Sequence, residues 1–129
     1  MTVFVDPASA GVAPGQVFVH HEANGDGDGP MKTRAKFWEV VAVTPRRVRA
    51  AEMVTRTVRE IPDPDGVFYG GRTIVPVPGS HFAGTESLMR MSVGWMRAGE
   101  VLLHLPRRRY IWRSTAARWD GEPVFVHPN

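Results

Sequence analysis

Glycine and proline recur throughout this chain, and their load disfavours long helices. The 129 residues include 13 Gly and 11 Pro, which favour short strands joined by turns. Strand-like alternation or β-branched content marks residues 15–22, 37–44, 46–60 and 72–78. A chain of this length supports one hydrophobic core, so we expect a single β-rich domain over residues 1–129.

Local detail refines three of these strands. In segment 46–60 a helix competes, because RAAEM are good helix formers, but five β-branched residues between Val48 and Val58 favour a strand. Segment 37–44 has apolar residues on both phases, with Glu39 as its only charge. This pattern predicts a β-bulge that lets the strand serve two sheets. Pro76 confines segment 72–78 to an edge or a bulge.

The remaining segments are shorter. Residues 85–93 fit either one strand or two helical turns, whereas 100–105, 109–113 and 124–126 resemble strands. Residues 114–119 predict one helical turn capped by Ser114. An acidic Gly/Asp loop is expected at 23–30 and a Pro/Gly loop at 61–71. The whole pattern predicts a mostly β fold, either a small SH3-like barrel or a compact, strongly bent β-sandwich, with at most one short helix.

Several function classes lack their sequence signatures. The absence of Cys excludes disulfides, thiolate nucleophiles and Cys-type zinc sites. No signal peptide and no apolar run of roughly 18 residues is found, so we expect no membrane contact and a cytoplasmic location in the host cell. No GxSxG, HExxH or P-loop motif occurs. Five of the 13 acids lie in predicted turns, namely Asp26, Asp28, Asp63, Asp65 and Asp120. We therefore expect a protein that is not an enzyme and has no cofactor.

The acidic loop partly matches a calcium-binding loop. Asn24, Asp26, Asp28 and Gly29 have the spacing of its positions one, three, five and six. The twelfth position, however, would be Ala35, where a bidentate Glu is required. The loop therefore predicts a solvated hairpin connection and no metal site.

Arginine supplies most of the positive charge. The chain has 16 basic and 13 acidic residues, a net charge of +3, and only Lys32 and Lys36 are lysines. Residues 104–113 contain four Arg and no acid. Arg107, Arg109 and Arg113 share one face of a strand there, opposite Trp112.

This row of arginines could contact the phosphates of a nucleic acid or an acidic patch on a protein. The alternative without a specific role is a solvated face. Arg47 and Arg49 extend the candidate basic surface, and Trp112 and Trp119 are the candidate stacking or contact residues. A net charge of +3 is low for a dedicated DNA-binding protein, which favours a protein partner.

A set of short motifs in a fixed order carries a family resemblance. These are Phe37 and Trp38, Val40 and Val41, Val43 and Thr44, Val75 to Val77, Phe82, and Trp119 to Pro123. Over residues 37–123 the chain resembles small β-rich proteins of phages and mobile elements that have no established biochemical role. The Arg-rich, Lys-poor usage fits a phage of a GC-rich, actinobacterium-like host.

These observations predict a non-enzymatic phage accessory protein that binds a host or phage macromolecule. They favour a protein as this partner. Two alternatives stay open: a nucleic-acid-binding small barrel that uses the Arg/aromatic strand, and a virion structural component. We expect a monomer or an edge-paired homodimer, with pairing at 124–126 or along 46–60.

Overall fold

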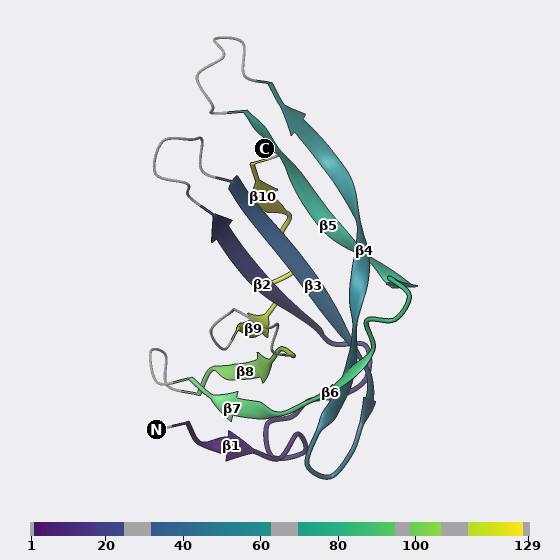
Figure 1. The fold of residues 1–129 in the computed structure, drawn as a ribbon, viewed down its shortest axis with the longest axis vertical. Coiled ribbons are helices and arrows are strands. Elements are labelled where there is room, and N and C mark those ends of the chain that lie inside the picture. Colours follow the sequence, from purple (N-terminus) through teal and green to yellow (C-terminus); the bar gives the residue numbers. More distant parts are fainter. Residues whose placement is uncertain (1, 25–31, 63–69, 95–98, 107–113, 128–129) are drawn as a thin grey trace.

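The computed structural model describes residues 2–24, 32–62, 70–94, 99–106 and 114–127. Within these ranges there is no helix, and thus none long and apolar enough to cross a membrane. All ten strands belong to one antiparallel sheet (Figure 1). They are β1 (Phe4–Val5), β2 (Val17–Asn24), β3 (Lys32–Val43), β4 (Val48–Ile61), β5 (Gly71–His81), β6 (Ser87–Met89), β7 (Met91–Val93), β8 (Val101–His104), β9 (Thr115–Arg118) and β10 (Val124–Val126).

The sheet is open. Its strand order is β1-β7-β8-β9-β2-β3-β4-β5-β10, and β6 pairs with β4 beside this path. The two end strands, β1 and β10, do not pair with each other, so the sheet is not closed into a barrel. The all-β prediction is confirmed, and the closed SH3-like barrel is wrong. The physical reason lies in β4, which pairs with β3 through its first residues and then continues outward with β5.

Two hydrophobic clusters divide the molecule into two halves. The first cluster lies among β2, β3, β4 and the short strands β6 to β9, and its fully buried members include Phe18, Met91 and Leu103. The second cluster lies where the β2–β3 hairpin faces β4, β5 and β10, and it contains Phe37, Met53 and Ile74 among others. The two long hairpins, β2–β3 and β4–β5, extend beyond the half that holds the first cluster (Figure 1). We call the half around the second cluster the outer half.

The bulge predicted in segment 37–44 is confirmed. The register between β3 and β4 shifts between Val40 and Ala42. Neighbouring residues of β3 also serve different clusters, since Phe37 belongs to the second and Trp38 to the first. The strand that joins the two halves is β4, however, which pairs with β6 at one end and with β5 over the rest.

The other local predictions have mixed outcomes. Segment 46–60 is a strand, and the last short strand, 124–126, is confirmed as an edge. The helical turn predicted at 114–119 is wrong, because these residues form β9 between β2 and β8. Ala116 of β9 is 0% exposed in the first cluster, so tertiary pairing overrides the local capping signal. Segment 85–93 forms two strands, β6 and β7, and 109–113 lies outside the described residues.

Pro76 is accommodated next to an irregularity, as its position predicted. It lies opposite Thr55 of β4, beside a register shift between Met53 and Thr55. Met53 pairs with His81, and Thr55 pairs with Pro76. A longer stretch of β5 therefore lies opposite a shorter stretch of β4. The extra residues of β5 include Gly79, whose φ is 74°, and they bend the strand away from a regular ladder.

Candidate protein-binding surface

The long strands β3 and β4 separate partway along their length. Their ladder begins at the loop that joins them and ends at the pair of Trp38 and Glu52. Beyond this pair β3 continues with β2, and β4 continues with β5. Among the described residues, neither strand has a ladder partner on the side that faces the other. We call the opening between them the β3–β4 split.

Hydrogen bonds identify the β3 residues whose backbone faces the split. The N–H of Val40 donates to the Gln16 carbonyl at 2.9 Å, and the Val40 carbonyl accepts from the Gly15 N–H at 2.8 Å. Val40 therefore directs both backbone groups to the β2 side. Because these groups alternate in direction along a strand, Ala35 and Thr33 direct theirs into the split.

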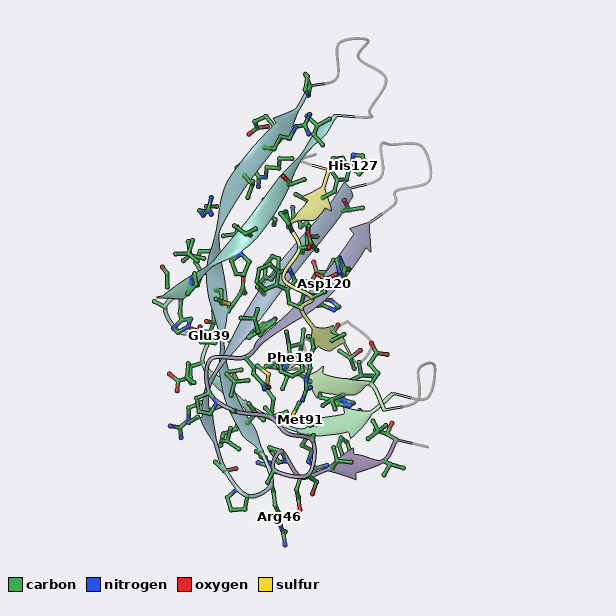
Figure 2. The ribbon with its side chains drawn as sticks, turned by 180° about the vertical axis from the view of Figure 1, so that it is seen from behind. Phe18, Glu39, Arg46, Met91, Asp120 and His127 are labelled. Carbon is green, nitrogen blue, oxygen red and sulfur yellow. The ribbon has the colours of Figure 1, made fainter. Side chains whose placement is uncertain are left out.

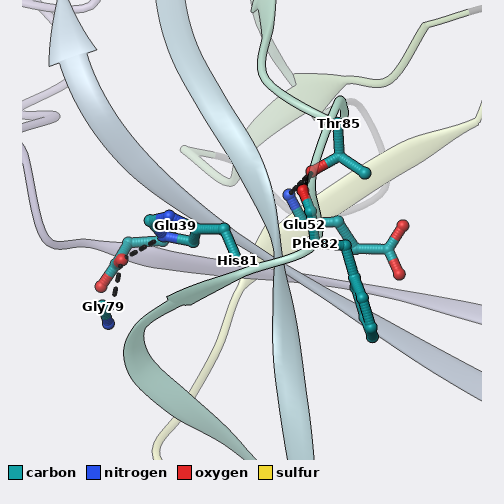
Figure 3. A network of polar contacts seen from close by, with 6 residues as sticks. All are labelled: Glu39, Glu52, Gly79, His81, Phe82 and Thr85. Atoms are coloured by element: carbon teal, nitrogen blue, oxygen red, sulfur yellow. Dashed lines mark hydrogen bonds and ion pairs between the residues drawn. The ribbon is translucent and has the colours of Figure 1, made fainter.

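The same reasoning applies to β4. The Glu52 carbonyl accepts from the Phe82 N–H at 2.9 Å, and its N–H donates to Thr85 Oγ1 at 3.0 Å (Figure 3). Glu52 thus directs its backbone groups toward the segment between β5 and β6. By alternation, Met53 and Thr55 direct their N–H and carbonyl groups into the split.

A groove of about 410 Å³ occupies this part of the outer half. Its apolar lining includes Met53, Ile74 and Val126, which belong to the second cluster. Its charged lining includes Arg34 and Arg72. At the far end His127 also lines the groove, and its N–H donates to Thr33 Oγ1 at 2.9 Å (His127 is labelled in Figure 2). The groove therefore combines unpaired strand backbone, an apolar floor and basic side chains.

A polar brace joins β3 to β5 at the start of the split. Glu39 Oε1 lies 2.6 Å from His81 Nε2 and accepts a longer hydrogen bond, 3.3 Å, from the Gly79 N–H (Figure 3). The Glu39 side chain is only 13% exposed. The brace ties the bulged end of β5 to β3, which explains why the apolar segment 37–44 carries Glu39 as its one charge.

The end of β4 beyond the groove is exposed on consecutive residues. Residues 56–60 are all exposed, and Val58 retains 47% of its accessible surface. Arg56 and Arg59 lie in this stretch. No described residue forms an ion pair with either arginine, and the same holds for Arg34 and Arg72. Within the described ranges, no carboxylate compensates these four guanidinium groups.

The residues predicted as a basic surface fall in two groups. Arg107, Arg109, Arg113 and Trp112 lie outside the described residues. Arg49 forms an ion pair with Glu86 at 3.5 Å on the surface, and the backbone of Arg47 is held in its turn by Thr44. This turn includes Arg46 and lies at the opposite end of the molecule from His127 (Figure 2). The structure does not bring Arg47 and Arg49 to the groove.

Trp119 has a packing role. Its ring meets Phe37 edge-on at a centroid distance of 5.6 Å, and its indole N–H donates to the Glu122 carbonyl at 2.8 Å. The Asp120 side chain closes the turn by accepting from the Glu122 N–H at 2.9 Å. Trp119 thus covers the second cluster, and its use as a contact residue stays a prediction.

Two further features bear on chemistry. Ser92 Oγ lies 2.6 Å from His104 Nε2, the arrangement of a nucleophile and its base, but Ser92 is only 3% exposed, so a substrate would have little access to this oxygen. In the described ranges no group of three or more His, Asp or Glu side chains is placed to hold a metal ion. Residues 25–31 of the acidic loop lie outside those ranges.

Sequence reasoning missed the β3–β4 split. The available signal was a change in charge along segment 46–60. Residues 50–55 contain one charged residue, whereas three of the five residues 56–60 are charged. That signal reveals a change in burial but not the loss of a pairing partner.

Comparisons with models of known protein families, with curated proteins and with solved structures found no match to this chain.

Proposed function

We propose that this chain is a non-enzymatic phage accessory protein that binds a host or phage protein in the cytoplasm of the host cell. The observation that carries the proposal is the outer end of β4. Its edge away from β5 has no ladder partner among the described residues, and it has five consecutive exposed residues, 56–60. An open edge is a template for pairing with another chain, and a bulge and charged side chains restrict which chain can add to it. Here the bulge lies between Thr57 and Arg59, and the charges are those of Arg56, Arg59 and Glu60.

The shape of the outer half supports this role. We interpret it as a strongly bent β-sandwich, in which the β2–β3 hairpin faces β4, β5 and β10 across the second cluster. The cluster packs against β4 through Met53, and the Glu39 brace ties β3 to β5, the ladder neighbour of β4. The edge of β4 is therefore presented by a rigid support. A preorganised surface loses less conformational entropy when a partner binds.

The non-enzymatic part of the proposal rests on the burial of Ser92, which limits access to the Ser92 and His104 pair, and on the absence of catalytic motifs from the sequence. Val58, an exposed apolar side chain flanked by arginines, supports a protein partner. Interfaces characteristically combine apolar contact with arginine.

A photo-crosslinking amino acid at position 58 tests the proposal. The matched control position is Leu88 of β6, which is 50% exposed against 47% for Val58 but belongs to the other half of the molecule. We expect lysate of an actinobacterial host, with or without phage infection, to give a discrete crosslinked protein from position 58 and none from position 88.

Nuclease treatment of the lysate separates protein from nucleic acid. Capture at position 58 that disappears after this treatment would favour the nucleic-acid alternative. Equal capture at both positions, or none at either, would contradict the proposed surface.

A further inference from the structure

We propose that the β3–β4 split binds an extended, acidic segment of the partner protein, which adds to the edge of β4 as an extra strand. This inference rests on the proposed function and names the chemistry of its partner. The sites that receive it are the backbone groups of Met53 and Thr55, which face the split.

The backbone geometry favours an extended ligand. A strand added to β4 would lie about 4.8 Å from it and would exchange N–H and carbonyl hydrogen bonds with Met53 and Thr55. Each of these residues offers one donor and one acceptor on the same side. Strand addition to an open edge is a general mode of peptide recognition.

The groove floor determines the side-chain pattern of the ligand. Met53, Ile74 and Val126 line the groove, but as members of the second cluster they are only 1%, 4% and 5% exposed. Successive residues of an added strand point to opposite faces, so every second residue would lie at the margin of this buried apolar floor and extend it. We therefore infer that the segment carries apolar residues at alternate positions.

Charge determines the rest of the ligand. Arg34 and Arg72 line the groove, and Arg56 and Arg59 lie on the exposed end of β4. The nearby cation Lys36 is already placed 3.6 Å from Glu22, and the acids on the same stretch of β4 are Glu52 and Glu60. The basic groups without an ion-pair partner in the described ranges outnumber these acids, which favours a segment rich in Asp or Glu.

The same charges argue against a second copy of this chain as the occupant. An antiparallel pairing of β4 with its own copy would place Arg56 opposite Arg56 in a register centred on that residue, and opposite Arg59 in a register centred between Thr57 and Val58. Like charges at opposed positions destabilise a pair of strands, so we commit to an acidic partner segment.

Three synthetic peptides test the inference by fluorescence anisotropy at 150 mM salt. The probe is a labelled octapeptide of alternating Val and Asp. One control replaces every Asp by Lys, and the other keeps the sequence but methylates every second backbone nitrogen. We expect the Val/Asp peptide to bind. Each control should bind at least about tenfold more weakly, which corresponds to a loss of about 1.4 kcal/mol in binding free energy.

Two variants of the protein locate the site. Thr55→Pro removes the N–H that faces the split but none on the β5 side, and we expect about a tenfold loss of binding. Arg72→Glu should cause a similar loss through charge reversal, and it serves alone if Thr55→Pro does not fold. Arg46→Glu, in the turn far from the groove, is the matched charge-reversal control and should leave binding unchanged.

Equal binding of the methylated peptide would overturn strand addition, and equal binding of the Lys peptide would overturn the acidic preference. Failure of the Val/Asp peptide to bind would overturn the inference even if position 58 captures a protein, and in that case the proposed function stands. Peptide binding without capture at position 58 would support the groove as a peptide-binding site and would contradict the proposed function.

Discussion

Replacing Gly71 by Ala should weaken the attachment of β10 to the outer half. Gly71 is the first residue of β5 and lies opposite Ile61 of β4. A Cβ added there would lie 2.5 Å from the Val126 carbonyl oxygen and 2.6 Å from Cζ of Phe125. The oxygen belongs to the backbone of β10, so a rotamer change cannot relieve this contact, and the strand itself has to move.

The expected magnitude follows from these contacts. Overpacking typically costs about 1–3 kcal/mol, and the backbone contact places this site toward the upper end. A Gly to Ala change at a compatible site stabilises by about 0.4–1 kcal/mol through the unfolded chain, which offsets part of the cost. We expect a net loss of about 1–2 kcal/mol in the free energy of unfolding, and a decrease in Tm of about 3–10 °C.

Gly94→Ala is the matched control. A Cβ at Gly94 would meet Glu100 Oε2 at 3.3 Å, the flexible end of a side chain, so this variant should keep or slightly raise the Tm. The two variants should be compared by calorimetry and by urea unfolding. Equal Tm values for both would refute the packing of β10 on Gly71. Adding Phe125→Ala to Gly71→Ala should restore only part of the stability, because the Val126 oxygen remains.

Three further predictions follow from the packing and the surface. Phe37→Ala should lower the free energy of unfolding by about 3–5 kcal/mol in urea titrations, since Phe37 is fully buried in the second cluster; a loss below 1 kcal/mol would contradict that cluster. Arg49→Ala should change stability by less than about 1 kcal/mol, because its ion pair with Glu86 is solvent-exposed, and a larger loss in thermal melts would show a role that the ion pair does not explain. Chelator should leave the Tm unchanged, because Ala35 stands where a calcium loop needs Glu; a Tm that falls with chelator and recovers with Ca²⁺ would contradict this.

Local pattern was sufficient for most strands and insufficient for β9. Strand 46–60 was predictable because its β-branched residues outweigh its helix formers, and the bulge in β3 followed from apolar residues on both phases. Residues 114–119 were misjudged because Ser114 resembles a helix cap, whereas Ala116 pairs with Leu103 of β8 in the buried first cluster. A contact across the sheet is invisible to a local capping rule.

The candidate site was predictable only in its chemistry. The sequence showed an excess of arginine and located it on particular strands, but it pointed to Arg47 and Arg49 and not to the groove. Arg34 and Arg72 come from β3 and β5, and their common location depends on how those strands are placed around the second cluster.

Sequence alone determined that this chain forms short and medium strands without long helices, because β-branched content and the Gly/Pro load act within a few residues. The tertiary structure decided which strands pair and where a pair ends. Phe37 and Met53 both pack into the second cluster from strands that have separated. That burial accompanies the separation of β3 and β4, whose facing edges have no ladder partner among the described residues beyond Trp38 and Glu52. Burial between distant segments is a property that no local pattern contains.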